Sequence, residues 1–455
     1  MMTEACNATA VARGMKMLLA GLVAFAAVSV SAQTADELKK RVAELERELQ
    51  DTRARLAQAG DMAEGEEAAP DKIMLGPLSI GGAARVNFSI GNYDAELGRP
   101  SRAEEDGGVF ALDTFRLNLG FEKGPWVGKA EYRFYPGYGA NNHDGYNFLH
   151  TGWLGYNFQD DSQLQVGVNR VPFGPGAYGV SQSWMFDQHY YVGLADDMDL
   201  GVKYTTPCGD WTFDLAYYYA DEGSYHGENF SDDSARYSYD VVNESGNGYV
   251  EHNQFNVRGI YTMEAGDVTT DLGASLQYGL LESEGPQDDG DHFAGSVHAK
   301  SQWNNWTLTP QLTYYSYDVD DDQPLGTDEL VQMGAYDFAS LIASEAWIPA
   351  VSLSYYYETP QVAWLDYVIP YVEYSTIMKT HDDFNDSEML VLGSAWARGG
   401  WYIYTDLAFS NGNDFVGNEV GYGANPAPGF SSNRHGANPT DEWEYRFNIN
   451  FGYYF

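Results

Sequence analysis

Apolar and polar residues alternate along most of the chain beyond residue 77. Over 84–90, apolar side chains alternate with Arg85, Asn87 and Ser89. At the end of the chain, every second residue from Tyr445 to Phe455 is aromatic or isoleucine. A period of two predicts β-strands with one apolar and one polar face.

Sixteen such segments follow one another, joined alternately by short turns and by longer polar connections. Membrane β-strands need ~9–11 residues, and alternating short and long connections are typical of outer-membrane barrels. We therefore predict an all-β protein, a 16-stranded antiparallel transmembrane β-barrel over 78–455. Pro370 predicts a bulge in its strand. The predicted strands are 78–92, 109–122, 126–135, 148–158, 163–170, 199–205, 211–220, 252–264, 267–281, 291–302, 305–317, 347–357, 365–376, 388–397, 400–410 and 442–455.

The composition agrees with a membrane barrel. Aromatic residues make up 15% of the chain, including 35 tyrosines, yet the mean hydropathy is −0.41. Helical membrane proteins need apolar runs of about 20 residues, and none follows the N-terminal region. A soluble all-β protein is the alternative, but it would not need aromatic residues at its strand ends.

The first 77 residues have a different character. Arg13 and Lys16 precede an apolar stretch that ends in Val30-Ser31-Ala32, so 1–32 is predicted to be a secretory signal peptide. Heptad spacing over 33–59 predicts a periplasmic coiled coil, with a solitary helix against the barrel rim as the alternative. Residues 60–77 are predicted to be a linker. The heptad positions are Leu38, Val42, Leu45, Leu49 and Leu56.

The formal net charge of −41 argues against a nucleic-acid partner, because binding phosphates requires Lys and Arg. Most acids fall in the connections between strands, where they are solvated surface, raise the cation concentration at the pore mouth, or hold divalent ions shared with lipopolysaccharide. The sequence contains no Asp-x-Asp-x-Asp-Gly calcium loop. We predict no metal site and no cofactor.

Strand parity predicts which charges line the barrel. Arg446, on the last strand, is expected beside Arg85 once the barrel closes. In the alternative, residues such as Lys129, Glu131 and Arg133 simply pair with inward neighbours. The bases predicted to face the lumen are Arg85, Arg116, Lys129, Arg133, Arg258, Lys300 and Arg446.

The connection 171–198 is the predicted constriction. It is long and combines prolines and glycines with aromatic residues, a composition that suits a compact loop folded into the barrel. It carries Asp187, Asp196 and Asp197, so a basic wall would face an acidic loop across the pore. The alternative is a surface loop that packs on its neighbours or at a subunit interface.

The segment Val168-Asn169-Arg170-Val171-Pro172-Phe173-Gly174 resembles the strand-end motif before the third extracellular loop of the trimeric porins grouped with the phosphate-selective porins O and P. Coiled-coil-bearing dicarboxylate porins are similar. The architectural resemblance covers nearly the whole chain and implies a homotrimer, with a loop folded into each pore. The arginine ladder and lysine cluster of the phosphate-selective members have no match here, so phosphate specificity is not carried over.

These features predict an outer-membrane porin for passive diffusion of small hydrophilic solutes or ions. We expect it among the lipids and lipopolysaccharide of the Gram-negative outer membrane, with its coiled coil in the periplasm. A structural or adhesive barrel with little conductance is the alternative. Enzymatic activity is not expected, because the nine histidines are dispersed and no Gly-x-Ser-x-Gly motif occurs.

Overall fold

The computed structural model describes residues 72–92, 108–136, 145–222, 236–243, 247–336, 338–417 and 433–455. The predicted signal peptide and coiled coil, and the linker up to residue 71, lie outside these residues. Within the described part of the chain, no helix is long and apolar enough to cross a membrane.

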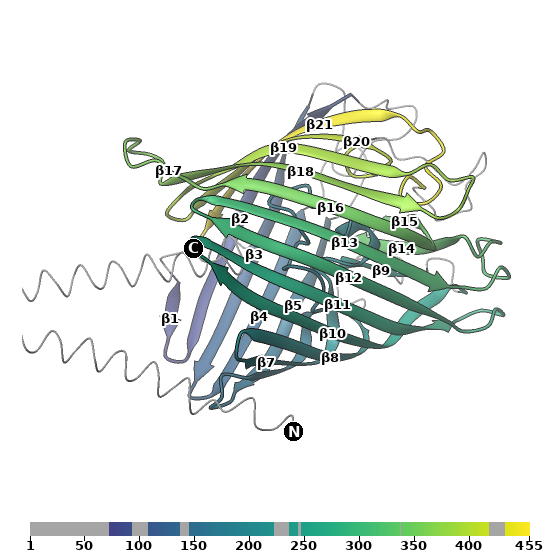
Figure 1. Ribbon diagram of the computed structural model, residues 1–455, viewed down its shortest axis with the longest axis horizontal. Coiled ribbons are helices and arrows are strands. Elements are labelled where there is room, and N and C mark those ends of the chain that lie inside the picture. The colour runs from purple at the N-terminus through teal and green to yellow at the C-terminus, as the bar shows by residue number, and fades with distance from the viewer. Residues whose placement is uncertain are drawn as a thin grey trace, which may run out of the picture.

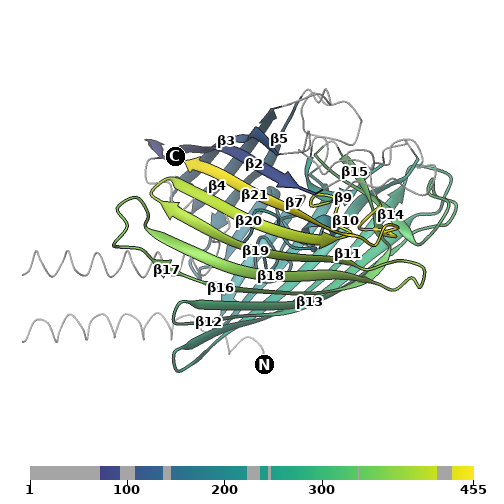
Figure 2. The same ribbon diagram turned by 90° about the horizontal axis from the view of Figure 1, so that it is seen from above.

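Sixteen antiparallel strands form a closed barrel (Figures 1 and 2). Each strand pairs with the next one along the wall, and the last pairs with the first. This confirms the predicted strand number and order. The wall strands are β2 (Leu78–Gly91), β3 (Val109–Lys123), β4 (Trp126–Pro136), β5 (Gly145–Asn157), β6 (Gln163–Arg170), β7 (Met198–Cys208), β8 (Trp211–Asp221), β10 (Tyr249–Ala265), β11 (Val268–Ser283), β12 (Gly290–Trp303), β13 (Trp306–Asp318), β16 (Glu345–Tyr355), β18 (Tyr367–Lys379), β19 (Ser387–Arg398), β20 (Trp401–Asn411) and β21 (Trp443–Tyr454).

Short turns lie at one end of the barrel and longer connections at the other. Two-residue turns follow β7 and β19 and begin with Gly209 (φ +63°) and Gly399 (φ +52°). A positive φ at the first turn position suits glycine and matches the twist of an antiparallel hairpin. Two short strands, β1 (Ile73–Leu75) and β17 (Tyr357–Glu358), add to β2 and β18.

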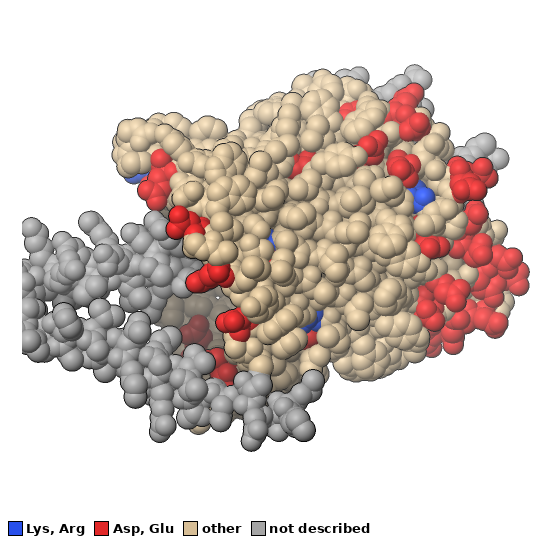
Figure 3. All heavy atoms as spheres, in the orientation of Figure 1, with Lys and Arg blue, Asp and Glu red and all other residues tan. Residues whose placement is uncertain are grey.

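The barrel wall is apolar outside and polar inside. On β21, Tyr445, Phe451 and Tyr453 are 36–39% exposed, whereas Arg446 and Asn448 are completely buried. Figure 3 shows a broad surface of uncharged side chains, with most carboxylates gathered toward its two ends. A soluble barrel would bury its apolar face, so this arrangement excludes the soluble alternative.

The bulge predicted at Pro370 is wrong. β18 keeps an unbroken register with β19, in which Pro370 lies opposite Ser394. On the other side of β18, pairing with β16 stops at Tyr371 and resumes with β17 at Val368. Proline has no N–H to donate, so it interrupts the hydrogen bonding on one side without adding a residue to the strand.

A small inner sheet, formed by segments predicted to be connections, lies among the buried residues. It consists of β9 (Arg236–Val241), β14 (Leu330–Tyr336) and β15 (Phe338–Ala343). All six residues of β9 are buried. The Tyr239 ring lies 5.3 Å from that of Tyr190 in the short helix η1 (Tyr190–Val192), which belongs to the connection between β6 and β7. The inner sheet therefore packs against this connection.

Candidate functional site: the barrel lumen

The connection between β6 and β7, residues 171–197, crosses the lumen. Although β6 and β7 are neighbours, its hydrogen bonds reach the far wall at β11, β13, β18 and β20. They are Gly174 N to Ser275 Oγ (3.1 Å), His189 Nε2 with Thr313 Oγ1 (2.8 Å), Ser181 Oγ to Glu373 Oε2 (2.8 Å) and Trp184 N to Asp406 Oδ2 (3.2 Å). The loop lies inside the barrel, as predicted, and the surface-loop alternative is wrong.

Two of the three predicted acids of this loop, Asp187 and Asp196, have partners within it or next to it. Asp187 accepts hydrogen bonds from the backbone N–H groups of Val180 (2.7 Å) and His189 (2.8 Å), and lies 2.9 Å from His189 Nδ1. Asp196 pairs with Arg170 Nη2 at 3.0 Å and accepts the Tyr237 hydroxyl. These carboxylates hold the loop in shape.

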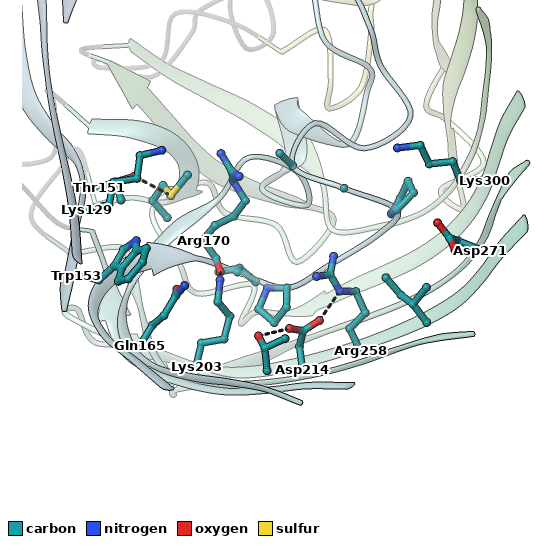
Figure 4. Close-up of a pocket in the computed structure, with 18 residues that line it drawn as sticks. Lys129, Thr151, Trp153, Gln165, Arg170, Lys203, Asp214, Arg258, Asp271 and Lys300 are labelled. Carbon is teal, nitrogen blue, oxygen red and sulfur yellow. Dashed lines mark hydrogen bonds and ion pairs between the residues drawn. The ribbon is translucent and has the colours of Figure 1, made fainter. Parts of the chain in front are cut away.

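A cavity of about 500 Å³ lies on the short-turn side of the loop (Figure 4). Most of its charged lining residues stand near the strand ends that lead into short turns, such as Lys129 on β4 and Lys300 on β12. In Figure 4 these two side chains approach from opposite sides and point toward the middle of the cavity. The charged residues of the lining are Lys129, Arg170, Lys203, Arg258, Lys300, Asp214 and Asp271.

Positive charge dominates this cavity, because five bases and two acids leave a formal charge of +3. Asp214 accepts hydrogen bonds from Arg258 Nε (2.8 Å) and Thr205 Oγ1 (2.6 Å). Asp271 lies opposite Lys300 in the β11–β12 register. A cleft lined by one sign of charge concentrates ions of the other sign. This cavity can therefore enrich small anions.

Of the predicted pore bases, Lys129, Arg258 and Lys300 line the cavity, whereas three others are buried in ion pairs. Arg85 Nη2 lies 2.8 Å from Asp113 Oδ2. Arg116 Nη1 lies 3.5 Å from Glu131 Oε1, which also pairs with Arg133. The pairing of Glu131 with Arg133, considered as an alternative, is confirmed.

The predicted proximity of Arg446 to Arg85 is wrong. Arg446 lies opposite Gly91, and Arg85 lies opposite Gly452 on the other part of β21. The Arg446 guanidinium donates to the Phe415 carbonyl and lies over the Phe415 ring at 4.6 Å. It belongs to the packing on the long-loop side of the lumen.

The sequence matches no known protein-family model and no curated relative. Solved structures nevertheless share the architecture. The outer membrane channel DcaP of Acinetobacter baumannii is 11% identical with a TM-score of 0.52, over 83% of this chain and 97% of that one. Salmonella typhi OmpF in complex with daunomycin is 10% identical with a TM-score of 0.50, over 85% of this chain and 100% of that one. Pseudomonas putida OprB is 8% identical with a TM-score of 0.50, over 83% of this chain and 94% of that one. The fold is that of outer-membrane porins.

Two cavity bases of this porin fold were not among the predicted site residues. Arg170 is the last residue of a predicted strand and belongs to the quoted motif. Lys203 follows Val202, which is exposed on the outer wall, so the Lys203 side chain points inward. The Lys203 Nζ donates to the Arg170 carbonyl at 2.7 Å. Parity within 199–205 was the available signal for Lys203.

Proposed function

We propose that this protein is a passive diffusion porin of the Gram-negative outer membrane that prefers small hydrophilic anions. The observation that carries the anion preference is the set of five basic side chains around the cavity beneath the 171–197 loop. Asp187 is held by contacts within the loop, and Asp196 pairs with Arg170 and so offsets one of the five bases, which leaves the lining basic. Small anionic metabolites are the solutes that this lining suits best.

The exposed aromatic residues support a place in the membrane. Trp126, Trp211, Trp306 and Trp401 each begin a strand directly after a short turn, and they are 39–47% exposed. Tryptophan favours the level of the lipid headgroups, where its ring is apolar and its N–H remains hydrated. We therefore infer that the short turns face the periplasm and the long connections face outward, next to lipopolysaccharide.

The oligomeric state is also part of the proposal. The heptad pattern over 33–59 and the resemblance to trimeric porins support a homotrimer with its coiled coil in the periplasm. Native mass spectrometry of the mature protein in mild detergent should give three chains per particle. A monomer under these conditions would contradict the proposal.

The primary experiment measures the reversal potential in a planar lipid bilayer that separates unequal KCl concentrations. Purified protein should conduct and favour chloride, despite a net charge of −41 for the whole chain. A preference for potassium would contradict the role of the basic cavity. A membrane with inserted protein but no conductance would favour the structural or adhesive barrel instead.

Solute class can be tested by liposome swelling. A small dicarboxylate should enter faster than an uncharged sugar of similar size, because the basic cavity inside the barrel attracts anions. Equal rates would mean that size alone decides passage.

A further inference from the structure

Four buried carboxylates converge beside the inserted loop. Asp197 ends the loop, Asp199 lies in β7, Glu222 directly follows β8, and Asp240 lies in β9. One oxygen from each lies within 4.8 Å of the corresponding oxygens of the others. All four residues are at most 5% exposed. We call them the buried acid cluster.

Neighbouring groups hold two of these carboxylates, those of Glu222 and Asp199, by one oxygen each. Glu222 Oε1 accepts the backbone N–H groups of Tyr237 (3.0 Å) and Ser238 (2.8 Å). Asp199 Oδ2 accepts from Gln254 Nε2 at 2.9 Å. In contrast, Glu222 Oε2, Asp199 Oδ1 and Asp197 Oδ1 are buried and receive no hydrogen bond from a donor in the described part of the chain. Buried polar atoms are normally satisfied, so these oxygens indicate that the cluster takes up either a proton or a ligand.

Among the residues that the structure describes, the surrounding charges do not balance the cluster. Arg236 Nη1 lies 3.6 Å from Asp240 Oδ2, but it is closer, at 2.5 Å, to Asp221 Oδ2. Asp221 and Glu251 add further negative charge around the cluster. A single guanidinium cannot compensate this number of buried carboxylates, and uncompensated buried charge is strongly unfavourable. The cluster requires either protons or a cation.

We propose that the buried acid cluster binds a calcium ion. Calcium takes oxygen ligands at about 2.3–2.6 Å, so two ligands on opposite sides of the ion are about 4.6–5.2 Å apart. The separations within the cluster allow one ion to contact all four carboxylates. Zinc prefers nitrogen and sulfur ligands, and magnesium keeps several waters and demands a stricter octahedron. The ligand chemistry therefore favours calcium.

A cation in the buried acid cluster would hold the 171–197 loop in place. It would join the end of the inserted loop to two wall strands and to the inner sheet. Asp197 already links both ends of the loop, because its carbonyl accepts the Val171 N–H at 2.9 Å. The proposal is independent of the anion preference and concerns how the loop is held. It also replaces the sequence-based expectation of no metal site, since the four ligands come from separate elements.

Calcium binding can be measured on the purified full-length protein in detergent after treatment with EDTA. Calorimetric titration with CaCl₂, together with metal analysis after dialysis, should give one ion per chain. Calcium should raise the temperature of thermal unfolding more than the same concentration of magnesium. Asp199→Asn/Asp240→Asn should abolish both effects. Gln254→Ala, which removes the orienting bond to Asp199, should weaken binding by about 10–100-fold.

The matched control is Asp320→Asn/Asp322→Asn, in a group of three carboxylates of which Asp321 and Asp322 are exposed and Asp320 is half-buried; this variant should bind as the wild type does. If calcium neither binds to the wild type nor raises its unfolding temperature, protons neutralise the cluster and the proposal is wrong. It is equally wrong if the cluster variant binds calcium normally, if the control variant loses it, or if magnesium binds as tightly. The wild-type and Gln254→Ala results decide the matter if the double variant fails to fold.

Discussion

Reversing the two lysines that face each other across the cavity should reverse the ion selectivity of the pore. Lys129 and Lys300 extend from β4 and β12 toward the middle of the cavity (Figure 4). Lys129→Glu/Lys300→Glu would change the formal charge of the cavity lining from +3 to −1. The sign of the local field would therefore change, while the width of the barrel stays the same.

The expected size of the effect follows from Coulomb's law. At ~8 Å in water, one unit charge changes the energy of a passing monovalent ion by about 0.5 kcal/mol. Screening over one Debye length at physiological salt leaves roughly 0.2 kcal/mol. The double variant changes the charge of the lining by four units, and each unit acts with opposite sign on anions and cations. The free-energy difference between a passing anion and a passing cation therefore changes by about 1.5 kcal/mol. This corresponds to about a tenfold change in the permeability ratio toward cations.

The assay is the reversal potential of single channels across a KCl gradient, repeated at low and high salt. The control is Lys123→Glu/Arg398→Glu, which makes the same change in charge at two exposed positions beside short turns. The control should keep the wild-type selectivity, and the effect of the cavity variant should shrink at high salt. An unchanged reversal potential in the cavity variant, or an equal shift in the control, would refute the role of the basic cavity.

Three further predictions concern the ion pairs and the loop. Glu131→Gln should lower the free energy of unfolding by about 3–5 kcal/mol, because it leaves two buried arginines without their carboxylate. Urea unfolding in detergent measures this loss, and a loss below about 1 kcal/mol would contradict the prediction. Asp187→Ala should loosen the inserted loop and increase single-channel conductance, since hydrogen bonds to a charged group are worth about 1.5–3 kcal/mol each; unchanged conductance would contradict this. Burial and neighbouring carboxylates raise the pKa of Asp197 and Asp240 in the folded protein. In EDTA, the stability that these two protonated carboxyl groups contribute is therefore fully present below the ordinary aspartate pKa. It is lost as the pH rises through their raised pKa values. Thermal unfolding in EDTA should therefore show the wild type losing stability relative to Asp199→Asn/Asp240→Asn between acid and neutral pH, and parallel pH profiles would contradict this.

The sequence by itself determined the wall of this protein. Lipid outside and water inside impose a period of two on every strand, so side-chain parity is visible without any knowledge of the partner strands. For this reason the sixteen wall strands, the short turns and the inward direction of Arg116 and Lys129 could be predicted. The composition of 171–198 likewise predicted a loop folded into the lumen, because aromatic residues with glycine and proline suit a packed loop.

Only the tertiary structure decided which inward charges meet. Asp113 and Thr114 both point inward because the β2–β3 register shifts at Arg85, and this bulge brings Asp113 to Arg85. The stagger of the closing strands places Arg446 opposite Gly91, and no parity rule fixes that stagger. The buried acid cluster gathers residues from a loop, two wall strands and the inner sheet. Such groups become neighbours only when the barrel closes and the loop enters it, because contacts across the lumen leave no periodic pattern in the sequence.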